Sequence, residues 1–302
     1  MHQSTRATWI GLTAILFWAA IVGLIRSVSE HFGAWGGGAL IYSAASILLL
    51  FTRGFPNLRT FPRRYLWWGA ATFVAYELCL ALSIGLSDNA QQAIEVGMVN
   101  YLWPTFTILS SILFLKTRAS LWILPGFLLS MAGIVLVLQG DQSFDFTAMT
   151  ANVRANPLSY GLALIGAFLW AGYSTITARF ANNSDGITPF FMLVALTLWI
   201  AYAVQDTPPI VFTPNALMHL VLAALAMGLG YAAWNVGILR GNLVILAGAS
   251  YFIPVLSAIF AATWLSTPLS SRFWVGASLV TLGSILCWVS TQTSPPSKAE
   301  NT

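Results

Sequence analysis

Ten apolar runs divide this chain, and they constrain its fold more than any other feature. The runs are residues 7–28, 34–51, 65–86, 91–115, 121–138, 157–180, 188–204, 216–239, 244–265 and 273–291. A helix rises about 1.5 Å per residue, so about 20 apolar residues cross the ~30 Å hydrocarbon core of a bilayer. The sequence therefore predicts an all-α integral membrane protein with ten transmembrane helices.

Composition excludes a soluble protein. Hydrophobic residues make up 58% of the 302 residues and charged residues 7%, which is far more apolar surface than one soluble core can bury. Cys79 and Cys287 fall inside apolar runs, where a thiol behaves as a small buried hydrophobe. The histidines, His2, His31 and His219, lie near run ends, and the sequence contains no Asp-rich motif of the kind that metal or catalytic clusters use. We expect no catalytic residues, no metal and no cofactor, and hence no enzyme.

The two halves of the chain resemble each other. At offsets of 150 to 152 residues, the matching pairs are Trp18 with Trp170, Tyr101 with Tyr251, Pro104 with Pro254, Gly126 with Gly276 and Gly133 with Gly283. Each half holds five spans, an odd number, so the second half enters the membrane from the opposite side. We therefore expect an inverted repeat of two five-helix halves around a central cavity. Chance identity at a few apolar positions is the alternative.

This repeat sets the expected domain organisation. Residues 1–140 form the first five-helix repeat, and 157–292 form the second. A polar linker, 141–156, joins them. The tail 293–302 contains two adjacent prolines and almost no apolar residue, so we expect it to be disordered.

Prolines interrupt the fourth and ninth runs at Pro104 and Pro254. A proline has no N–H to donate and crowds the carbonyl four residues back, which frees the carbonyls of Asn100 and Ser250. Unsatisfied backbone within a membrane is tolerated only where it is buried in protein or lines a water-filled cavity. The two matched prolines therefore predict one cavity between the halves, with helices that bend beside it.

Acidic residues inside the runs are candidates for function. Glu77 and Glu95 lie within the third and fourth runs, where a carboxylate must face the bundle interior or water. Each could bind substrate or carry a proton, or it could only make a buried structural hydrogen bond. Glu95 could also reach the outer surface. A proton relay and a passive facilitator both remain open.

Several aromatic residues lie deep in their runs, away from the interfacial positions that tryptophans usually take. Among them are Trp18, Trp103, Trp170, Trp234, Tyr76, Tyr101, Tyr173, Tyr231 and Tyr251. A buried tyrosine or tryptophan needs a partner for its polar atom, and a cavity holding an amphipathic aromatic ligand supplies one. Helix packing explains any single position equally well.

Basic residues predict the orientation. If the N-terminus is cytoplasmic, ten of the 13 basic residues lie in cytoplasmic segments and only Arg26, Arg154 and Arg272 lie outside. Positive charge favours the cytoplasmic side, so we expect both termini there. The net charge of +4 then reflects contact with the lipid bilayer, and we expect no nucleic-acid partner.

These features together resemble the drug/metabolite transporter superfamily, in its EamA-type exporter branch. Within that branch, Tyr76-Glu77 and the stretch 100–104 (Asn-Tyr-Leu-Trp-Pro) are similar to the aromatic amino acid exporters of the YddG type, and the similarity extends along the whole chain. The resemblance implies a monomeric exporter of phenylalanine, tyrosine and tryptophan in the bacterial inner membrane, working by alternating access.

The resemblance and the proline breaks together select candidate residues. Those expected to bind substrate are Tyr76, Glu77, Asn100, Tyr101, Trp103, Pro104, Trp170, Ser250 and Tyr251. Further candidates along the cavity are Trp18, Glu95, Tyr173, Tyr231, Trp234 and Pro254.

Other functions compete with this one. A multidrug exporter of aromatic cations uses the same scaffold and would also want aromatic residues beside an acid. Carriers of nucleotide sugars or phosphate esters bind anionic substrates and therefore need cationic residues in the cavity, and the apolar runs predict none there. A membrane enzyme would need a cluster of catalytic residues, and this sequence contains none. A membrane sensor would have the same helices but would not transport a substrate.

Overall fold

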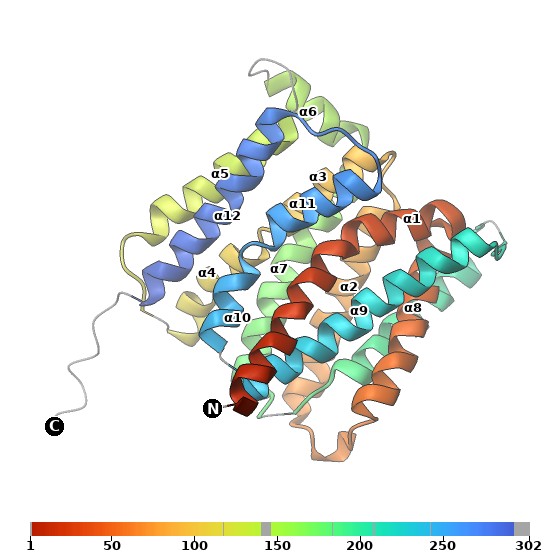
Figure 1. Ribbon diagram of the computed structural model, residues 1–302, viewed down its shortest axis with the longest axis horizontal. Helices are drawn as coiled ribbons and strands as arrows, with labels where there is room; N and C mark the ends of the chain where they lie inside the picture. The colour runs from red at the N-terminus through yellow and green to blue at the C-terminus, as the bar shows by residue number, and fades with distance from the viewer. Residues whose placement is uncertain are drawn as a thin grey trace.

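A computed structural model describes residues 2–292 apart from 117, 140–145, 183, 208 and 242. Every regular element among these residues is a helix (Figure 1). The α-helices are α1 (His2–Arg53), α2 (Ala70–Gly85), α3 (Ala90–Asn100), α4 (Trp103–Leu115), α5 (Ile123–Gln139), α6 (Phe146–Ala155), α7 (Pro157–Phe180), α8 (Ile187–Val204), α9 (Pro214–Arg240), α10 (Leu243–Ser250), α11 (Ile253–Trp264) and α12 (Ser271–Gln292). A short 3-10 helix (Leu58–Thr60) follows α1, and a π-helical turn (Tyr65–Gly69) leads into α2.

Long apolar helices dominate the fold. Among the described residues, seven helical stretches are long and apolar enough to cross a membrane, and α5 and α11 are shorter apolar helices. Gly33 divides α1 into two segments, because its φ of 71° and ψ of 166° are non-helical values that glycine adopts at little cost. The described helices other than α6 form the ten predicted segments. In this comparison α1 provides two segments, whereas α3 with α4, and α10 with α11, provide one each.

Both predicted proline breaks are present. α3 ends at Asn100 and α10 ends at Ser250, and a new helix begins three residues later in each case. Pro104 and Pro254 each lie in the first turn of the new helix, where the missing N–H leaves no helical hydrogen bond unmade. Each break is therefore a full interruption of two residues rather than a bend in a continuous helix.

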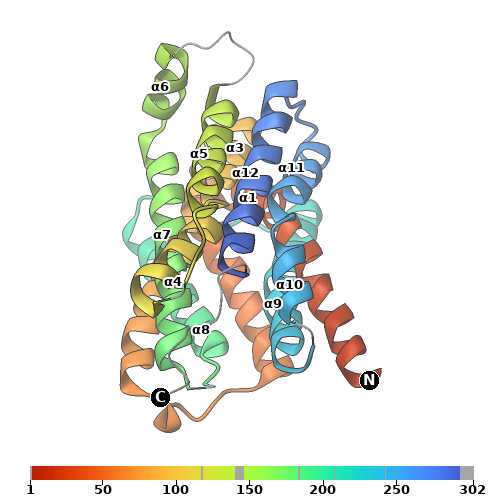
Figure 2. The ribbon, with the colours of Figure 1, turned by 90° about the vertical axis from the view of Figure 1, so that its left-hand side faces the viewer.

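α5 and α12 pack side by side at one edge of the molecule (Figures 1 and 2). A Cβ atom on Gly133 would lie 2.6 Å from the carbonyl oxygen of Gly276, so only glycines allow the two backbones to approach this closely. The hydroxyl of Thr105 on α4 lies 3.1 Å from that of Ser130 and 3.2 Å from that of Ser284. Glycines and small hydroxyl side chains therefore bring α5 and α12 together beside α4.

The two ends of the molecule differ. The N-terminus lies at the bottom of Figure 1, together with the turn between α1 and α2, and we call this the N-terminus end. α6 lies at the top, and we call this the α6 end. α6 falls within the predicted linker, whose residues 141–145 are outside the described part, as is the predicted tail 293–302.

Candidate functional site

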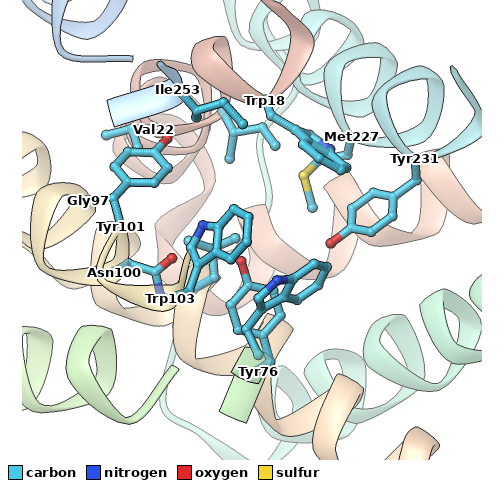
Figure 3. Close-up of a pocket in the computed structure, with 13 residues that line it drawn as sticks. Trp18, Val22, Tyr76, Gly97, Asn100, Tyr101, Trp103, Met227, Tyr231 and Ile253 are labelled. Atoms are coloured by element: carbon cyan, nitrogen blue, oxygen red, sulfur yellow. The ribbon is translucent and has the colours of Figure 1, made fainter. Parts of the chain in front are cut away.

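A pocket in the middle of the bundle brings together residues from both halves of the chain (Figure 3). We call it the inner pocket. Five of the predicted substrate-binding residues line it, namely Tyr76, Asn100, Tyr101, Trp103 and Trp170. Trp18 and Tyr231, expected along the cavity, also line it. Its volume is about 50 Å³, which is room for a few water molecules.

Aromatic rings form much of its wall. The ring centroids of Tyr76 and Trp170 are 4.6 Å apart, and Trp103 meets Trp170 edge to face at 5.8 Å. The first helix break places Asn100, Tyr101 and Trp103 on this wall, because the chain turns there between α3 and α4. Rings at these spacings attract one another and offer faces and edges to a further aromatic group.

Asn100 adds a polar atom to the wall. Its Nδ2 donates a hydrogen bond to the carbonyl oxygen of Ala163 on α7, at 3.3 Å. An amide nitrogen can only donate and the oxygen can only accept, so this bond sets the orientation of the side chain. The Asn100 oxygen is then an acceptor suited to an ammonium group.

A second cavity adjoins the inner pocket and extends toward the N-terminus end; we call it the vestibule. Its volume is about 460 Å³. Trp18, Trp170 and Tyr231 line both cavities, and the predicted residues Tyr173 and Trp234 line the vestibule alone. Small-molecule sites in proteins are commonly about 300–1,000 Å³, so the vestibule has the room that the inner pocket lacks.

Glu77 is fully buried but lines neither cavity. Its carboxylate accepts hydrogen bonds from the hydroxyl of Tyr42, at 2.6 Å, and from that of Tyr231. One acidic side chain on α2 therefore ties together α1 and α9. Direct contact between Glu77 and substrate stays a prediction.

Glu95 lies apart from the inner pocket. Its carboxylate accepts hydrogen bonds from the hydroxyl of Tyr160, at 2.5 Å, and from the amide of Gln91, at 3.0 Å. It lines a separate polar pocket with Asp88 and Gln92, beside the turn between α2 and α3. A substrate role for Glu95 likewise stays a prediction.

The second helix break contributes less to the cavities than the first. Tyr251 packs against Trp288 of α12, with ring centroids 5.9 Å apart. Ser250, Pro104 and Pro254 are buried but are not among the residues that line either cavity. The repeat-related tyrosines thus take different roles, because Tyr101 faces the inner pocket and its counterpart faces α12.

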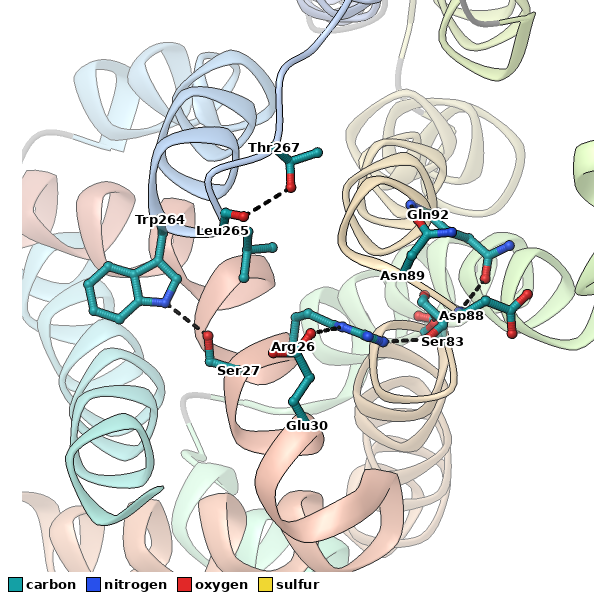
Figure 4. Close-up of polar contacts among 11 residues, drawn as sticks. Arg26, Ser27, Glu30, Ser83, Asp88, Asn89, Gln92, Trp264, Leu265 and Thr267 are labelled. Atoms are coloured by element: carbon teal, nitrogen blue, oxygen red, sulfur yellow. Dashed lines mark hydrogen bonds and ion pairs between the residues drawn. The ribbon is translucent and has the colours of Figure 1, made fainter. Parts of the chain in front are cut away.

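Arg26 is a residue that sequence reasoning missed as a functional candidate. It lies within α1, where it pairs with Glu30 at 2.8 Å and donates a hydrogen bond to the carbonyl oxygen of Ser87 (Figure 4). Nearby, the indole of Trp264 donates to the hydroxyl of Ser27 at 3.0 Å. These contacts, which we call the seal, tie α1 to the α2–α3 turn and to α11. An arginine with a glutamate four residues later in an apolar run was the available signal.

Asp185 was missed as well. It lies in the α7–α8 connection and lines the vestibule. Its Oδ2 accepts hydrogen bonds from Arg53 at 2.7 Å and from Asn235 at 2.8 Å. A single aspartate in a short loop carries no sequence signal of this role. Within the described residues, no group of three or more His, Cys, Asp or Glu side chains is placed to hold a metal ion.

Known proteins resemble this chain over nearly its whole length. A model of the EamA-like transporter family matches residues 157–289. The aromatic amino acid exporter YddG of Salmonella typhimurium (strain 14028s / SGSC 2262) is 50% identical over 289 residues, which cover 96% of this chain and 99% of that protein. The chain belongs to the EamA-like transporter family. The aromatic amino acid exporter YddG of Escherichia coli (strain K12) is also 50% identical, over 95% of this chain and 98% of that protein.

More distant relatives agree. The aromatic amino acid exporter YddG of Ancylobacter novellus is 27% identical over 84% of this chain and 86% of its own length. A crystal structure superposes with a TM-score of 0.67 at 22% identity, covering 96% of this chain and 99% of that one, so the fold is shared. The chain is a multi-pass membrane transporter, and its relatives are transporters rather than enzymes. The predicted family is confirmed.

Proposed function

We propose that this protein exports aromatic amino acids, namely phenylalanine, tyrosine and tryptophan, across a bacterial inner membrane. The observation that carries the proposal is the inner pocket, whose wall of tyrosine and tryptophan rings suits an aromatic side chain. The 50% identity to exporters named for this activity supports it.

Each part of such a substrate has a counterpart in the pocket. Its ring packs against Trp103 and Trp170, and its ammonium group donates to the amide oxygen of Asn100. Neither cavity is lined by a described lysine or arginine, so the carboxylate accepts hydrogen bonds from the hydroxyls of Tyr76 and Tyr101.

Transport follows by alternating access between two inverted five-helix repeats. With both termini cytoplasmic, the vestibule faces the cytoplasm and the seal closes the periplasmic end. Rocking at the two helix breaks opens the seal and closes the vestibule. The cavities lie within a single chain, so a monomer suffices.

Competition for transport in membrane vesicles tests the substrate. Unlabelled phenylalanine should suppress the flux of labelled tryptophan, and methyl viologen should not. Because no described lysine or arginine lines either cavity, an aromatic cation would fit as well, so a multidrug exporter is the second candidate. Suppression by methyl viologen and not by phenylalanine would favour that candidate.

A further inference from the structure

We propose that substrate first binds in the vestibule and that the side chain of Trp18 is the gate between the vestibule and the inner pocket. This inference rests on the proposed function, because it assigns a path to the aromatic substrate. Three residues line both cavities, namely Trp18, Trp170 and Tyr231. Trp170 and Tyr231 are held in place, and Trp18 moves.

Trp18, Trp170 and Tyr231 form the constriction between the cavities. The ring of Tyr231 lies 5.3 Å from that of Trp18 and 6.4 Å from that of Trp170, centroid to centroid, and it meets both edge to face. An aromatic substrate that enters the vestibule meets these three rings before it reaches Asn100. One of them must therefore move for the substrate to pass.

Tyr231 is held in place. Its hydroxyl donates to the fully buried carboxylate of Glu77, and its ring packs on Phe191 at 5.0 Å and on Phe73 at 6.0 Å. Moving it would break a buried hydrogen bond to a carboxylate, which is stronger than a hydrogen bond between neutral groups. Glu77 thus acts as a positioning residue for one side of the constriction.

Trp170 is held by rings rather than by a hydrogen bond. It packs on Tyr76 at 4.6 Å, on Tyr173 at 5.5 Å and on Trp103 at 5.8 Å. Its displacement would disrupt the wall of the inner pocket itself, which the substrate needs in order to bind.

Trp18 packs on fewer rings than Trp170, namely on Tyr231 at 5.3 Å and on Trp234 at 5.0 Å between ring centroids. Its indole nitrogen is buried, yet it finds no hydrogen-bond partner among the described residues. The pyrrole edge of the indole rests on Gly230 of α9, where a Cβ atom would lie 2.9 Å from both Cδ1 and Nε1. Moving this side chain breaks no hydrogen bond, and in the cavity its N–H gains water or the substrate carboxylate as an acceptor.

The cavity volumes agree with this assignment. The inner pocket, at about 50 Å³, is too small for an aromatic amino acid, whereas the vestibule holds about 460 Å³. In this conformation the vestibule accommodates substrate and the inner pocket does not. Displacement of the Trp18 indole joins the two spaces.

Cysteine labelling tests the gate without using transport. The native Cys79 and Cys287 are replaced by alanine, and a single cysteine is introduced as Ile253→Cys in the inner pocket or Ser174→Cys in the vestibule. Membrane vesicles of both orientations are treated with a membrane-impermeant thiol reagent, and the orientation in which Ser174→Cys reacts identifies the vestibule side. From that side, Ile253→Cys should react at least tenfold more slowly than Ser174→Cys.

Substitutions at Trp18 and at Gly230 should act in opposite directions. Trp18→Ala removes the indole and should speed the labelling of Ile253→Cys at least tenfold, and Trp18→Phe should have an intermediate effect. Gly230→Ala displaces the indole from α9 into the passage and should slow labelling several-fold. Gly161→Ala is the matched control, because nothing lies within 4 Å of a Cβ atom at that position.

Equal labelling rates for the two cysteines in the otherwise unchanged protein would overturn the gate, and so would an unchanged rate in both Trp18 variants. Labelling needs no substrate, so the result separates the gate from the substrate assignment. If labelling behaves as expected but phenylalanine is not transported, the proposed substrate is wrong and the gate stands.

Discussion

Glu77 shows what a single buried carboxylate does in this fold. It accepts from Tyr42 on α1 and Tyr231 on α9 while it lies on α2, so it connects three helices and sets the ring of Tyr231 against the cavity. A carboxylate inside a membrane is costly unless it is satisfied in this way. We therefore expect Glu77 to affect transport through Tyr231.

Replacing Glu77 by glutamine should abolish export while the protein stays folded. The amide keeps the shape of the side chain but cannot accept strongly from two hydroxyls, so Tyr231 loses its fixed position. Efflux assays on Glu77→Gln, Tyr231→Phe and the double variant measure this, and the double variant should lose little more than either single one. Wild-type flux in Glu77→Gln would contradict the assignment.

The amide oxygen of Asn100 is expected to accept a hydrogen bond from the ammonium group of the substrate. Asn100→Leu keeps a similar volume but removes the acceptor, so the KM for phenylalanine should rise about tenfold, which corresponds to about 1.4 kcal/mol. Inhibition by 3-phenylpropionate, which lacks the ammonium group, should not change. An equal loss for both compounds would show that the substitution merely damages the pocket.

At the residue scale, the direction in which each side chain points could not be predicted from the sequence. The deep aromatic residues were visible in the sequence, and Tyr76, Tyr101 and Trp103 do line the inner pocket. Tyr251 has the same local sequence features as Tyr101, yet it packs on Trp288. The sequence repeat could not distinguish the two, because small differences in helix rotation decide which face meets the cavity.

The elements themselves followed closely from sequence. Apolar run lengths predicted the ten helical segments, and prolines predicted both breaks, because each signal is local and physically strong. The seal also joins residues distant in the chain, such as Arg26 and Ser87, and no local pattern encodes that pairing.

Pro104 is expected to keep α3 and α4 apart. Alanine at this position restores an N–H for the carbonyl of Asn100 and favours one continuous helix, which stiffens the break. Pro104→Ala should therefore slow flux more than it lowers expression. Pro125→Ala in the first turn of α5, away from both cavities, is the control. Unchanged flux in Pro104→Ala would remove this break from the mechanism.

The contact between α5 and α12 is expected to be purely structural. A methyl group at Gly133 would meet the backbone of Gly276 at 2.6 Å, so Gly133→Ala should lower stability by about 1–3 kcal/mol. Thermal unfolding should show a lower Tm, while the KM of the folded fraction stays unchanged. Gly161→Ala, with open space around it and within helix α7, should not lower the Tm. A raised KM in Gly133→Ala would connect these helices to substrate binding.

At the scale of the whole molecule, the structure is asymmetric along its length. The vestibule extends toward the N-terminus end, whereas the Arg26 contacts join α1 to the α2–α3 turn nearer the α6 end. Alternating access requires a second arrangement in which these roles exchange. Sequence predicted that a cavity lies between the halves but not which end is open, because the repeat treats both ends alike.

The central claim is that aromatic amino acids cross the membrane through the inner pocket, and efflux from proteoliposomes tests it most directly. Vesicles containing the purified protein and labelled tryptophan are diluted into buffer, beside protein-free vesicles and vesicles containing Trp103→Ala. The account predicts saturable efflux that phenylalanine competes for, with a KM at least tenfold higher in Trp103→Ala. Efflux no faster than from protein-free vesicles, or identical efflux in Trp103→Ala, would contradict it.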